Sequence, residues 1–319
     1  MCHVSVVIPV YKVESYIERC LHTLFGQTLE EIEYIFVDDG SPDASVVKIG
    51  EVLEQYPHRK SQTKLLRHDR NRGVAAARTT GIRAATGEYL IHCDPDDYVE
   101  PDMYEKLYAK AKETDADVVV CDYWLEKATQ KKVVTPAYRD TPQQCLKDMY
   151  KKDGLYMHLW SKLVRRRLIS RYTIVPFAGT DYGEDLNCTM QIFYYAKHLA
   201  VVRKPLYHYC QREGSLSISS ASRAILNRRM DNAALICRFL QEKSGDTYET
   251  FCNHMKFCLK RQYQSVFDEN DYEWFHLYRE SHNAVLSLTL YPLKTRVILW
   301  IALQHYILYR IMKKFISGL

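Results

Sequence analysis

Several patterns that mark common protein classes are missing from this chain of 319 residues. Its ten cysteines lie singly from Cys2 to Cys258, with no CxxC pair and no partner at zinc-finger spacing. That distribution argues against a zinc module or a disulfide framework and favours reduced, cytosolic thiols. No GxGxxG follows the first strand-like run and no GxxxxGK[ST] occurs, which argues against NAD binding and against a P-loop.

Long hydrophobic runs and a strong excess of charge are lacking too. The longest apolar stretch, 297–303, ends at Gln304 and falls short of the ~20 residues that a membrane-spanning helix needs. The chain starts without a basic segment, so we expect no cleaved signal peptide. The net charge of +5 is too small to indicate a nucleic-acid partner.

This modest net charge is unevenly distributed. Residues 1–115 carry 14 basic and 20 acidic side chains, a net charge of −6, whereas residues 116–219 carry 16 and 10, a net charge of +6. The remaining residues carry 14 and 9, and no acidic residue follows Glu280. We therefore expect a first part that favours a divalent cation and a remainder suited to phosphates or to an anionic surface.

The first hundred residues alternate strand-like apolar runs with helical periods. Val4–Val10 is typical of a strand covered on both faces, and residues 15–26 follow with one apolar helical face. The alternation continues to Cys93 and predicts an α/β fold with a doubly wound, mostly parallel, Rossmann-like sheet. Further predicted elements are strands at 32–37, 64–67, 89–93, 117–121 and from 206, helices at 44–55 and 74–85, a helix opened by 183–185, and helices after 222 with breaks near Gly245, Asn270 and Pro292.

Carboxylates gather where the predicted strands end. Asp94, Asp96 and Asp97 follow one strand, and Asp38 and Asp39 follow another. Ligands of such sheets bind beyond the carboxyl ends of the strands, and Mg²⁺ or Mn²⁺ accepts one or two carboxylates plus substrate phosphates. A solvated turn with a helix N-cap explains the first cluster equally well, and a plain DG turn explains the second.

The order of these segments resembles the family 2 inverting glycosyltransferases of GT-A fold. The likeness is carried by VSVVIPVYKVESYIERCLHTLFGQT, IEYIFVDDGSPDAS and NRGVAAARTTGIRAATGEYLIHCDPDDYV, and Gly183-Glu184-Asp185 extends it to about residue 215. It implies a GT-A domain over 1–220, with 1–115 binding a nucleotide sugar and 116–220 the acceptor. A helical C-terminal region follows over 221–319.

The resemblance also assigns roles to the residues at the strand ends. Asp94 and Asp96 match the DxD motif that holds the ribose and the metal diphosphate, with Asp96 as the ligand of Mg²⁺ or Mn²⁺ and Asp97 beside them. Pro95 departs from the small polar residue that is more common there, at a position without a ligand role in the family. The implied nucleotide-sugar pocket further contains Pro9, Val10, Tyr11, Asp39, Asn71 and Arg78, where Asp39 meets the base and Arg78 pairs with acids or phosphate.

Asp185 matches the general base of the family, and we expect Glu184 to support it. The chemistry agrees, because a metal places positive charge on the leaving phosphates and a carboxylate within about 3 Å takes the proton of the attacking hydroxyl. One base and one metal suffice for a single displacement with inversion. Without the resemblance, two acids at a helix start are explained better by the helix dipole and the unpaired N–H groups of the first turn.

Basic residues beyond the DxD motif supply further candidates. Lys162 is a candidate phosphate ligand, whereas Arg165–Arg167 are expected on a solvated helix face. His208, Arg212 and Ser215 fit a lid over the diphosphate, and a hydrogen-bonded core imidazole remains an alternative for His208.

The last segment, 292–319, mixes apolar and aromatic residues with five basic ones. Such a helix either lies in the headgroup region of an anionic leaflet or packs as an ordinary helix, and the sequence leaves both open. We expect a cytoplasmic enzyme, peripheral on the inner face of the membrane. It would use a UDP-sugar and a saccharide or lipid-linked acceptor to build cell-surface polysaccharide or lipid-linked glycan.

Two other functions compete with this interpretation. A nucleotidyltransferase on a related sheet also uses a metal and paired carboxylates, but 10–14 lacks the Gly-rich loop with lysine that such enzymes carry. A non-catalytic nucleotide-sugar-binding scaffold has no reason to keep Asp94, Asp96 and Asp185.

Overall fold

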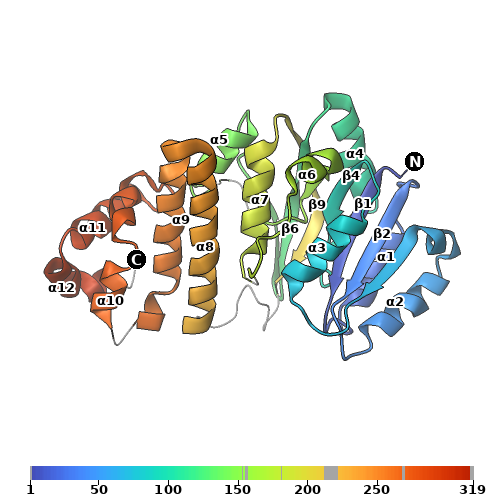
Figure 1. The fold of residues 1–319 in the computed structure, drawn as a ribbon, viewed down its shortest axis with the longest axis horizontal. Helices are drawn as coiled ribbons and strands as arrows, with labels where there is room; N and C mark the ends of the chain where they lie inside the picture. Colours follow the sequence, from blue (N-terminus) through green and yellow to red (C-terminus); the bar gives the residue numbers. More distant parts are fainter. Residues whose placement is uncertain are drawn as a thin grey trace. The chain divides into compact units, whose positions relative to one another are not determined.

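A computed structural model describes residues 2–152, 154, 157–180, 182–211, 222–267 and 270–316 (Figure 1). The chain divides into two compact units. The sheet unit comprises Met1–Gln143 and Met157–Ile218, and the helical unit comprises Gln144–Tyr156 and Ser219–Leu319. The short segment 144–156 therefore belongs to the helical unit, although it interrupts the sheet unit in the sequence.

Among the described residues, one sheet of nine strands forms the centre of the sheet unit, in the order β3-β2-β1-β4-β8-β6-β9-β5 with β7 paired to β6. The pairs β3-β2, β2-β1, β1-β4 and β6-β9 are parallel, and the others are antiparallel. The parallel pairs contain most of the paired residues, so the predicted α/β fold with a mostly parallel, doubly wound sheet is confirmed. The strands are β1 Val4–Val10, β2 Ile32–Asp38, β3 Thr63–Arg67, β4 Tyr89–His92, β5 Tyr98–Val99, β6 Val118–Lys127, β7 Gln130–Val134, β8 Lys162–Arg165 and β9 Leu199–Cys210.

Helices cover both faces of this sheet, because β1, β2 and β4 are buried along their whole length. On one face Val6 and Ile8 of β1 pack in a core with the apolar sides of α1 and α4. On the other face α3 lies so close that a Cβ on Gly81 would meet Val7 Cγ1 at 2.3 Å. The helices before residue 220 are α1 Ile17–Phe25, α2 Ser45–Glu54, α3 Val74–Ala84, α4 Met103–Thr114, α5 Pro142–Lys147, α6 Arg166–Tyr172 and α7 Glu184–Tyr195, with the 3₁₀ helix η1 at Pro57–Gln62. Most of α5 belongs to the helical unit.

The expectation for the basic segment 159–171 is wrong at Arg165. That residue ends strand β8 instead of lying on a solvated helix, and its guanidinium is 2.6 Å from Asp115 Oδ1. Arg166 donates to the Gly87 carbonyl at 2.5 Å, and Arg167 alone is exposed. The strand forms here because β8 fills the gap between β4 and β6 in the sheet, a contact that no local pattern reveals.

The helical unit begins its long helices after residue 222, as predicted. Gly245 follows α8 with a φ of +55°, Asn270 Oδ1 accepts the Glu273 N–H at 3.1 Å to cap α10, and Pro292 precedes α11. No helix in the described part of the chain has the length and hydropathy required to span a membrane. The elements are α8 Arg223–Ser244, η2 Gly245–Tyr248, α9 Glu249–Gln262, η3 Gln264–Phe267, α10 Asp271–His276, η4 Arg279–Ser287, α11 Leu293–Leu303 and α12 Tyr306–Ile316.

Candidate active site

The loops after β1 and β2 are joined to each other by hydrogen bonds. Ser41 Oγ accepts the Lys12 N–H at 2.8 Å and Ser45 Oγ accepts the Val13 N–H at 3.0 Å. Asp43 Oδ2 accepts the N–H of Glu14, whose own carboxylate accepts the Ala44 N–H at 2.8 Å. Among the predicted base-pocket residues, Pro9 and Val10 are buried within β1, whereas Tyr11 is exposed at its end.

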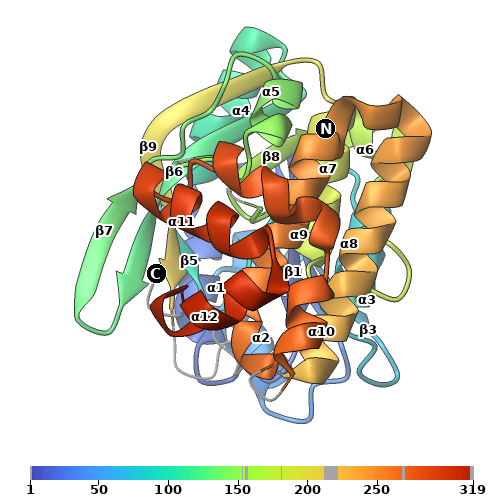
Figure 2. The same cartoon turned by 90° about the vertical axis from the view of Figure 1, so that its left-hand side faces the viewer.

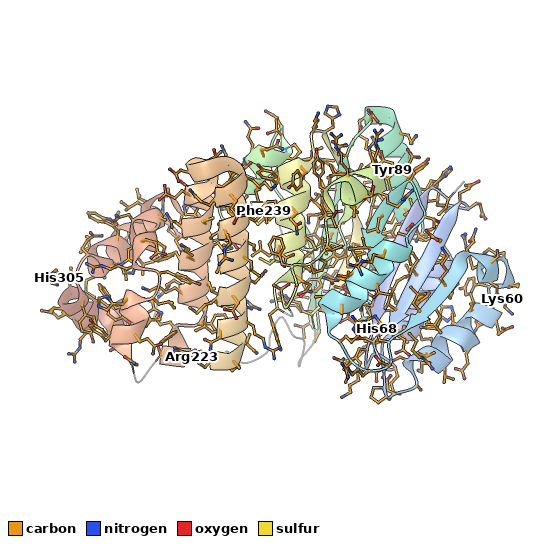
Figure 3. The ribbon with its side chains drawn as sticks, in the orientation of Figure 1. Lys60, His68, Tyr89, Arg223, Phe239 and His305 are labelled. Atoms are coloured by element: carbon orange, nitrogen blue, oxygen red, sulfur yellow. The ribbon has the colours of Figure 1, made fainter. Side chains whose placement is uncertain are left out.

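Asp39 is buried beneath the next loop. Its Oδ1 accepts the Arg72 N–H at 2.9 Å and its Oδ2 accepts the Gly73 N–H at 2.8 Å. His68 Nδ1 lies 2.6 Å from Asp39 Oδ1, and its Nε2 lies 2.9 Å from Thr80 Oγ1. Figure 3 labels His68 and Tyr89, the first residue of β4, at opposite ends of the sheet. No sequence motif marks His68, which is a single histidine beyond a short strand.

Two glycines allow these loops to approach. Gly40 has a φ of +68°, and a Cβ there would meet the backbone of Arg70 at 2.8 Å. Gly73 has a φ of +89° and precedes α3. Both conformations favour glycine, so the loops after β2 and β3 can pack together, with Asn71 exposed between them.

The three acids after β4 occupy different surroundings. Asp94 and Asp96 are half-buried, whereas Asp97 is buried. Asp97 Oδ2 accepts the Tyr207 hydroxyl at 2.7 Å and its Oδ1 accepts the Cys210 N–H at 2.8 Å. Burial and the nearby Asp94 raise the pKa of Asp97 well above its usual value. Asp97 therefore faces the protein interior, and its hydrogen bonds connect the DxD turn to β9.

Arg78 of α3 contacts both the DxD motif and the predicted general base, Asp185. Its Nη2 donates to Asp94 Oδ1 at 3.0 Å and its Nη1 donates to Glu184 Oε1 at 3.0 Å, while Asp185 Oδ1 is in direct contact with Nη1. Arg78 is almost fully buried. Burial lowers its pKa, but Asp94 and Glu184 outweigh this effect and raise it, so the guanidinium stays charged. Because α7 begins at Glu184, acids more than ninety positions apart in the sequence share one cation.

The cluster formed by Arg78 and its three carboxylates has a net negative charge, and all the atoms that it could offer to a metal ion are oxygens. Three carboxylates against one guanidinium give a net charge of −2, with Asp96 beside them in the chain. Carboxylate oxygens suit Mg²⁺ and Mn²⁺, so these residues fit a hard divalent cation. Within the described residues no three His, Cys, Asp or Glu side chains converge as a complete metal cage. Further ligands would therefore come from substrate or water.

Lys162 is buried away from solvent. It donates to the His158 carbonyl and lines an apolar cavity, and burial lowers its pKa to about 7. The cavity lies against α3, α6 and α7 on the face of the sheet opposite to α1 and α4, and its lining residues are Ile82, Leu90, His92, Leu159, Lys162, Val164, Ile169, Ile174, Cys188 and Ile192.

His208 has carboxylates at both ring nitrogens. Its Nδ1 lies 2.8 Å from Glu126 Oε1 and its Nε2 lies 2.9 Å from Glu100 Oε1, and the ring stacks on Tyr98 at a centroid distance of 4.0 Å. These contacts correspond to the alternative of a hydrogen-bonded core imidazole. Arg212 and Ser215, the other residues of the predicted lid, lie outside the described residues.

Comparison with known proteins identifies relatives of this chain. Residues 5–171 match the model of the glycosyl transferase family 2. The uncharacterized glycosyltransferase EpsJ of Bacillus subtilis is 32% identical over 220 residues, which are 67% of this chain and 62% of EpsJ, so the chain spans about three fifths of this relative.

Solved structures resemble the fold over nearly the whole chain. Staphylococcus aureus TarS 1–349 in complex with UDP-GlcNAc has a TM-score of 0.67 at 19% identity, covering 99% of this chain and 92% of that one. The mannosyltransferase PcManGT from Pyrobaculum calidifontis, in complex with GDP-Man and Mn²⁺, has a TM-score of 0.53 at 16% identity, covering 97% and 86%. The chain belongs to glycosyl transferase family 2 and has the GT-A fold that its sequence predicted.

Proposed function

We propose that the protein transfers a sugar from a nucleoside-diphosphate sugar to an acceptor hydroxyl, with inversion at the anomeric carbon. The observation that carries this proposal is Arg78, which holds the DxD residue Asp94 and the acids Glu184 and Asp185 around one buried guanidinium. Leaving-group binding and proton removal thereby share one site, as a single displacement requires.

Asp94 and Asp96 would hold the diphosphate end of the donor through Mg²⁺ or Mn²⁺. A bound divalent ion offsets charge on the leaving phosphates. The Mn²⁺ complex of PcManGT supports a metal, and the UDP-GlcNAc complex of TarS supports our choice of a UDP-sugar. Asp97 lies inside the turn and would position Asp94 through Tyr207, whose hydroxyl accepts the Asp94 N–H at 3.1 Å.

Asp185 would act as the general base. Its carboxylate is partly exposed, so an acceptor hydroxyl can reach it. The hydroxyl proton passes to this carboxylate as the acceptor oxygen bonds to the anomeric carbon and the bond to the phosphate oxygen breaks. Glu184 shares Arg78 with Asp185 and would fix its orientation.

Tyr11, Asn71 and Asp39 would receive the nucleoside at the adjoining loops. Tyr11 and Asn71 are exposed there and can contact a base or a ribose directly. Asp39 already accepts two backbone N–H groups, so it would shape the pocket and offer its remaining lone pairs to the base. Pro9 and Val10 would supply only the backbone wall of the pocket. Lys162, His208 and Arg212 are further candidates for contact with the donor.

The acceptor we propose is a saccharide or a lipid-linked saccharide, in the synthesis of a cell-surface polysaccharide or lipid-linked glycan. The protein would work in the cytoplasm, at the inner face of the membrane. The acidic cluster around Arg78 receives the donor, while the basic surplus of residues 116–319 suits a phosphorylated or membrane-bound acceptor.

A donor panel tests the transfer reaction. Hydrolysis or transfer should be measured with UDP-, GDP- and dTDP-sugars, with and without Mn²⁺, and we expect turnover with a UDP-sugar only when the metal is present. Asp96→Asn should reduce this turnover by roughly a hundredfold or more. Asp102→Asn, which changes an acid of the α4 N-terminus, is the matched control and should retain activity. Equal metal-dependent turnover in Asp96→Asn would show that the DxD assignment is wrong.

Replacing the proposed base separates chemistry from binding. Asp185→Asn should lower kcat by about 10² to 10⁴ while the Kd for UDP and Mn²⁺ changes little. Isothermal titration and single-turnover transfer provide the two readouts. Simultaneous loss of both would assign Asp185 a structural role through Arg78 instead.

A further inference from the structure

Exposed large apolar side chains concentrate in the helical unit. Fourteen such side chains are exposed among the described residues, and eight of them lie between positions 272 and 311. They are Tyr272, Leu286, Leu290, Leu293, Val297, Ile301, Ile307 and Ile311. Single exposed apolar residues are ordinary on protein surfaces, whereas a concentration of this kind marks an interaction surface.

Helix α11 is apolar on two opposite sides. Leu299, Ala302 and Leu303 are buried on one side, whereas Leu293 and Val297 lie exposed on the other, together with Ile301. Positions 293, 297 and 301 fall on one stripe because each is four residues from the next. Leu293 keeps 65% of its surface exposed. Each apolar side of a helix is normally covered by protein or by lipid, whereas the outer side of α11 is exposed.

Helix α12 carries a second set of exposed apolar side chains. Ile307 and Ile311 are one turn apart and remain 65% and 75% exposed, whereas Tyr309 between them is buried against Trp274. Figure 2 shows α11 and α12 together in front of α9, on one side of the helical unit. We call the side chains of Leu293, Val297, Ile301, Ile307 and Ile311 the outer apolar stripe.

Two exposed cations accompany this stripe. Lys294 and Arg310 are exposed on the same two helices, and no acidic residue follows Glu280 in the chain. Both acids of α10 are already paired, because Asp271 Oδ1 lies 2.5 Å from Lys313 Nζ and Glu273 contacts the guanidinium of Arg223. Among the described residues, the surface therefore combines apolar side chains with the positive charges of Lys294 and Arg310.

We infer that the outer apolar stripe docks the protein on an anionic lipid bilayer. Apolar side chains would enter the headgroup boundary while Lys294 and Arg310 meet lipid phosphates, a combination that interfacial helices use. A second copy of the chain fits less well, since a twofold contact through this stripe would bring the same cations against each other. The inference goes beyond the proposed transfer reaction and does not depend on it, although it explains how a lipid-linked acceptor would be reached.

Vesicle flotation of the full chain tests the surface. Vesicles of phosphatidylcholine and phosphatidylglycerol should bind the protein, and pure phosphatidylcholine should bind it at least roughly tenfold less, because about fivefold is expected from each cation near the surface. Leu293→Ser combined with Ile307→Ser and Ile311→Ser should reduce partition by about tenfold or more. Lys294→Gln with Arg310→Gln should remove the preference for the anionic lipid.

Matched variants in the sheet unit control for loss of apolar surface and charge. Val47→Ser with Leu65→Ser removes exposed apolar residues there, and Lys127→Gln with Lys204→Gln removes exposed cations. Both should bind vesicles like the parent, and all variants should keep the parent's circular dichroism and donor hydrolysis.

Two outcomes overturn the inference. The first is equal vesicle binding by the parent and the stripe variants. The second is no vesicle binding, together with a dimer in light scattering that the stripe variants dissociate, which would assign the stripe to a second copy. Absence of sugar transfer with intact vesicle binding would instead contradict the proposed function alone.

Discussion

At the scale of single residues, Arg78 determines how the candidate site is assembled. The resemblance identified Arg78, Asp94 and Asp185 separately, because each lies in a recognisable motif. The resemblance implied that Arg78 pairs with acids or phosphate, but the acids that it contacts could not be predicted, since they depend on the packing of α3 against the start of α7. Asp97 was expected beside the ligands and instead turns inward, because Tyr207 and the Cys210 N–H satisfy it there. His68 has no sequence signal at all.

Arg78→Met should damage stability and activity together. Removing the buried cation leaves three carboxylates without compensation, so we expect the free energy of unfolding to fall by about 3 kcal/mol. Transfer activity should fall by roughly a hundredfold, because the guanidinium no longer holds Asp94 and Asp185 in place. Urea unfolding and transfer assays measure the two effects. Arg83→Met, an exposed arginine on the same helix, should change neither.

At the scale of secondary structure, Glu33 of β2 links neighbouring elements of the sheet. Its Oε1 accepts the Ser5 hydroxyl of β1 at 2.5 Å and the Thr86 N–H at 2.6 Å, and its Oε2 lies 2.7 Å from Lys64 Nζ of β3. The apolar runs of β1, β2 and β4 made these strands predictable. The exposed, polar β7 and the basic β8 were not predictable, because β7 is a strand only through its pairing with β6 and β8 only through its pairing with β4 and β6.

Glu33 should also contribute to acid sensitivity. Burial raises its pKa, but hydrogen bonds from Lys64, Ser5 and Thr86 outweigh burial and lower the pKa from 4.5 to about 2. The carboxylate therefore stabilises the fold fully above about pH 4.5, and this contribution is lost as the pH falls toward 2. Glu33→Gln should lower the free energy of unfolding by about 2 kcal/mol at neutral pH. The loss of stability between about pH 4.5 and pH 2 should then be smaller than in the parent. The exposed Glu51→Gln should leave the limb unchanged in urea titrations at several pH values.

The contact between α3 and β1 gives a second prediction at this scale. Gly81→Ala should destabilise the protein by about 2 kcal/mol, because the new methyl group would overlap Val7. Combining it with Val7→Ala should recover at least about 1 kcal/mol relative to the sum of the single changes. Gly50→Ala on α2 meets nothing within 4 Å and should be neutral or stabilising. Strictly additive effects in a denaturation cycle would contradict this account of the interface.

At the scale of the whole molecule, the chain consists of two compact units with separate cores. The change from sheet to helices near residue 220 was visible in the sequence. The membership of 144–156 in the helical unit was not visible, because that segment lies between two parts of the sheet unit and only its contacts assign it.

Ligand binding should distinguish the two units in hydrogen exchange. UDP with Mn²⁺ at a hundred times Kd should stabilise the unit that binds it by about 2.7 kcal/mol. Amide hydrogens that exchange only when this unit unfolds should then exchange roughly a hundredfold more slowly. We expect this protection in β1, β2 and β4 and none in α8 or α9. Asp96→Asn should remove the part that depends on the metal. Equal protection in α8 would show that the two units unfold as one.

The joined loops after β1 and β2 bear on how fast a donor can bind. Four hydrogen bonds already fix the backbone at Lys12, Val13, Glu14 and Ala44. The conformational entropy of these residues is therefore lost during folding, so a nucleotide binds to loops that are already ordered. Its association should be a single kinetic phase that is first order in nucleotide, without a slow loop-ordering step.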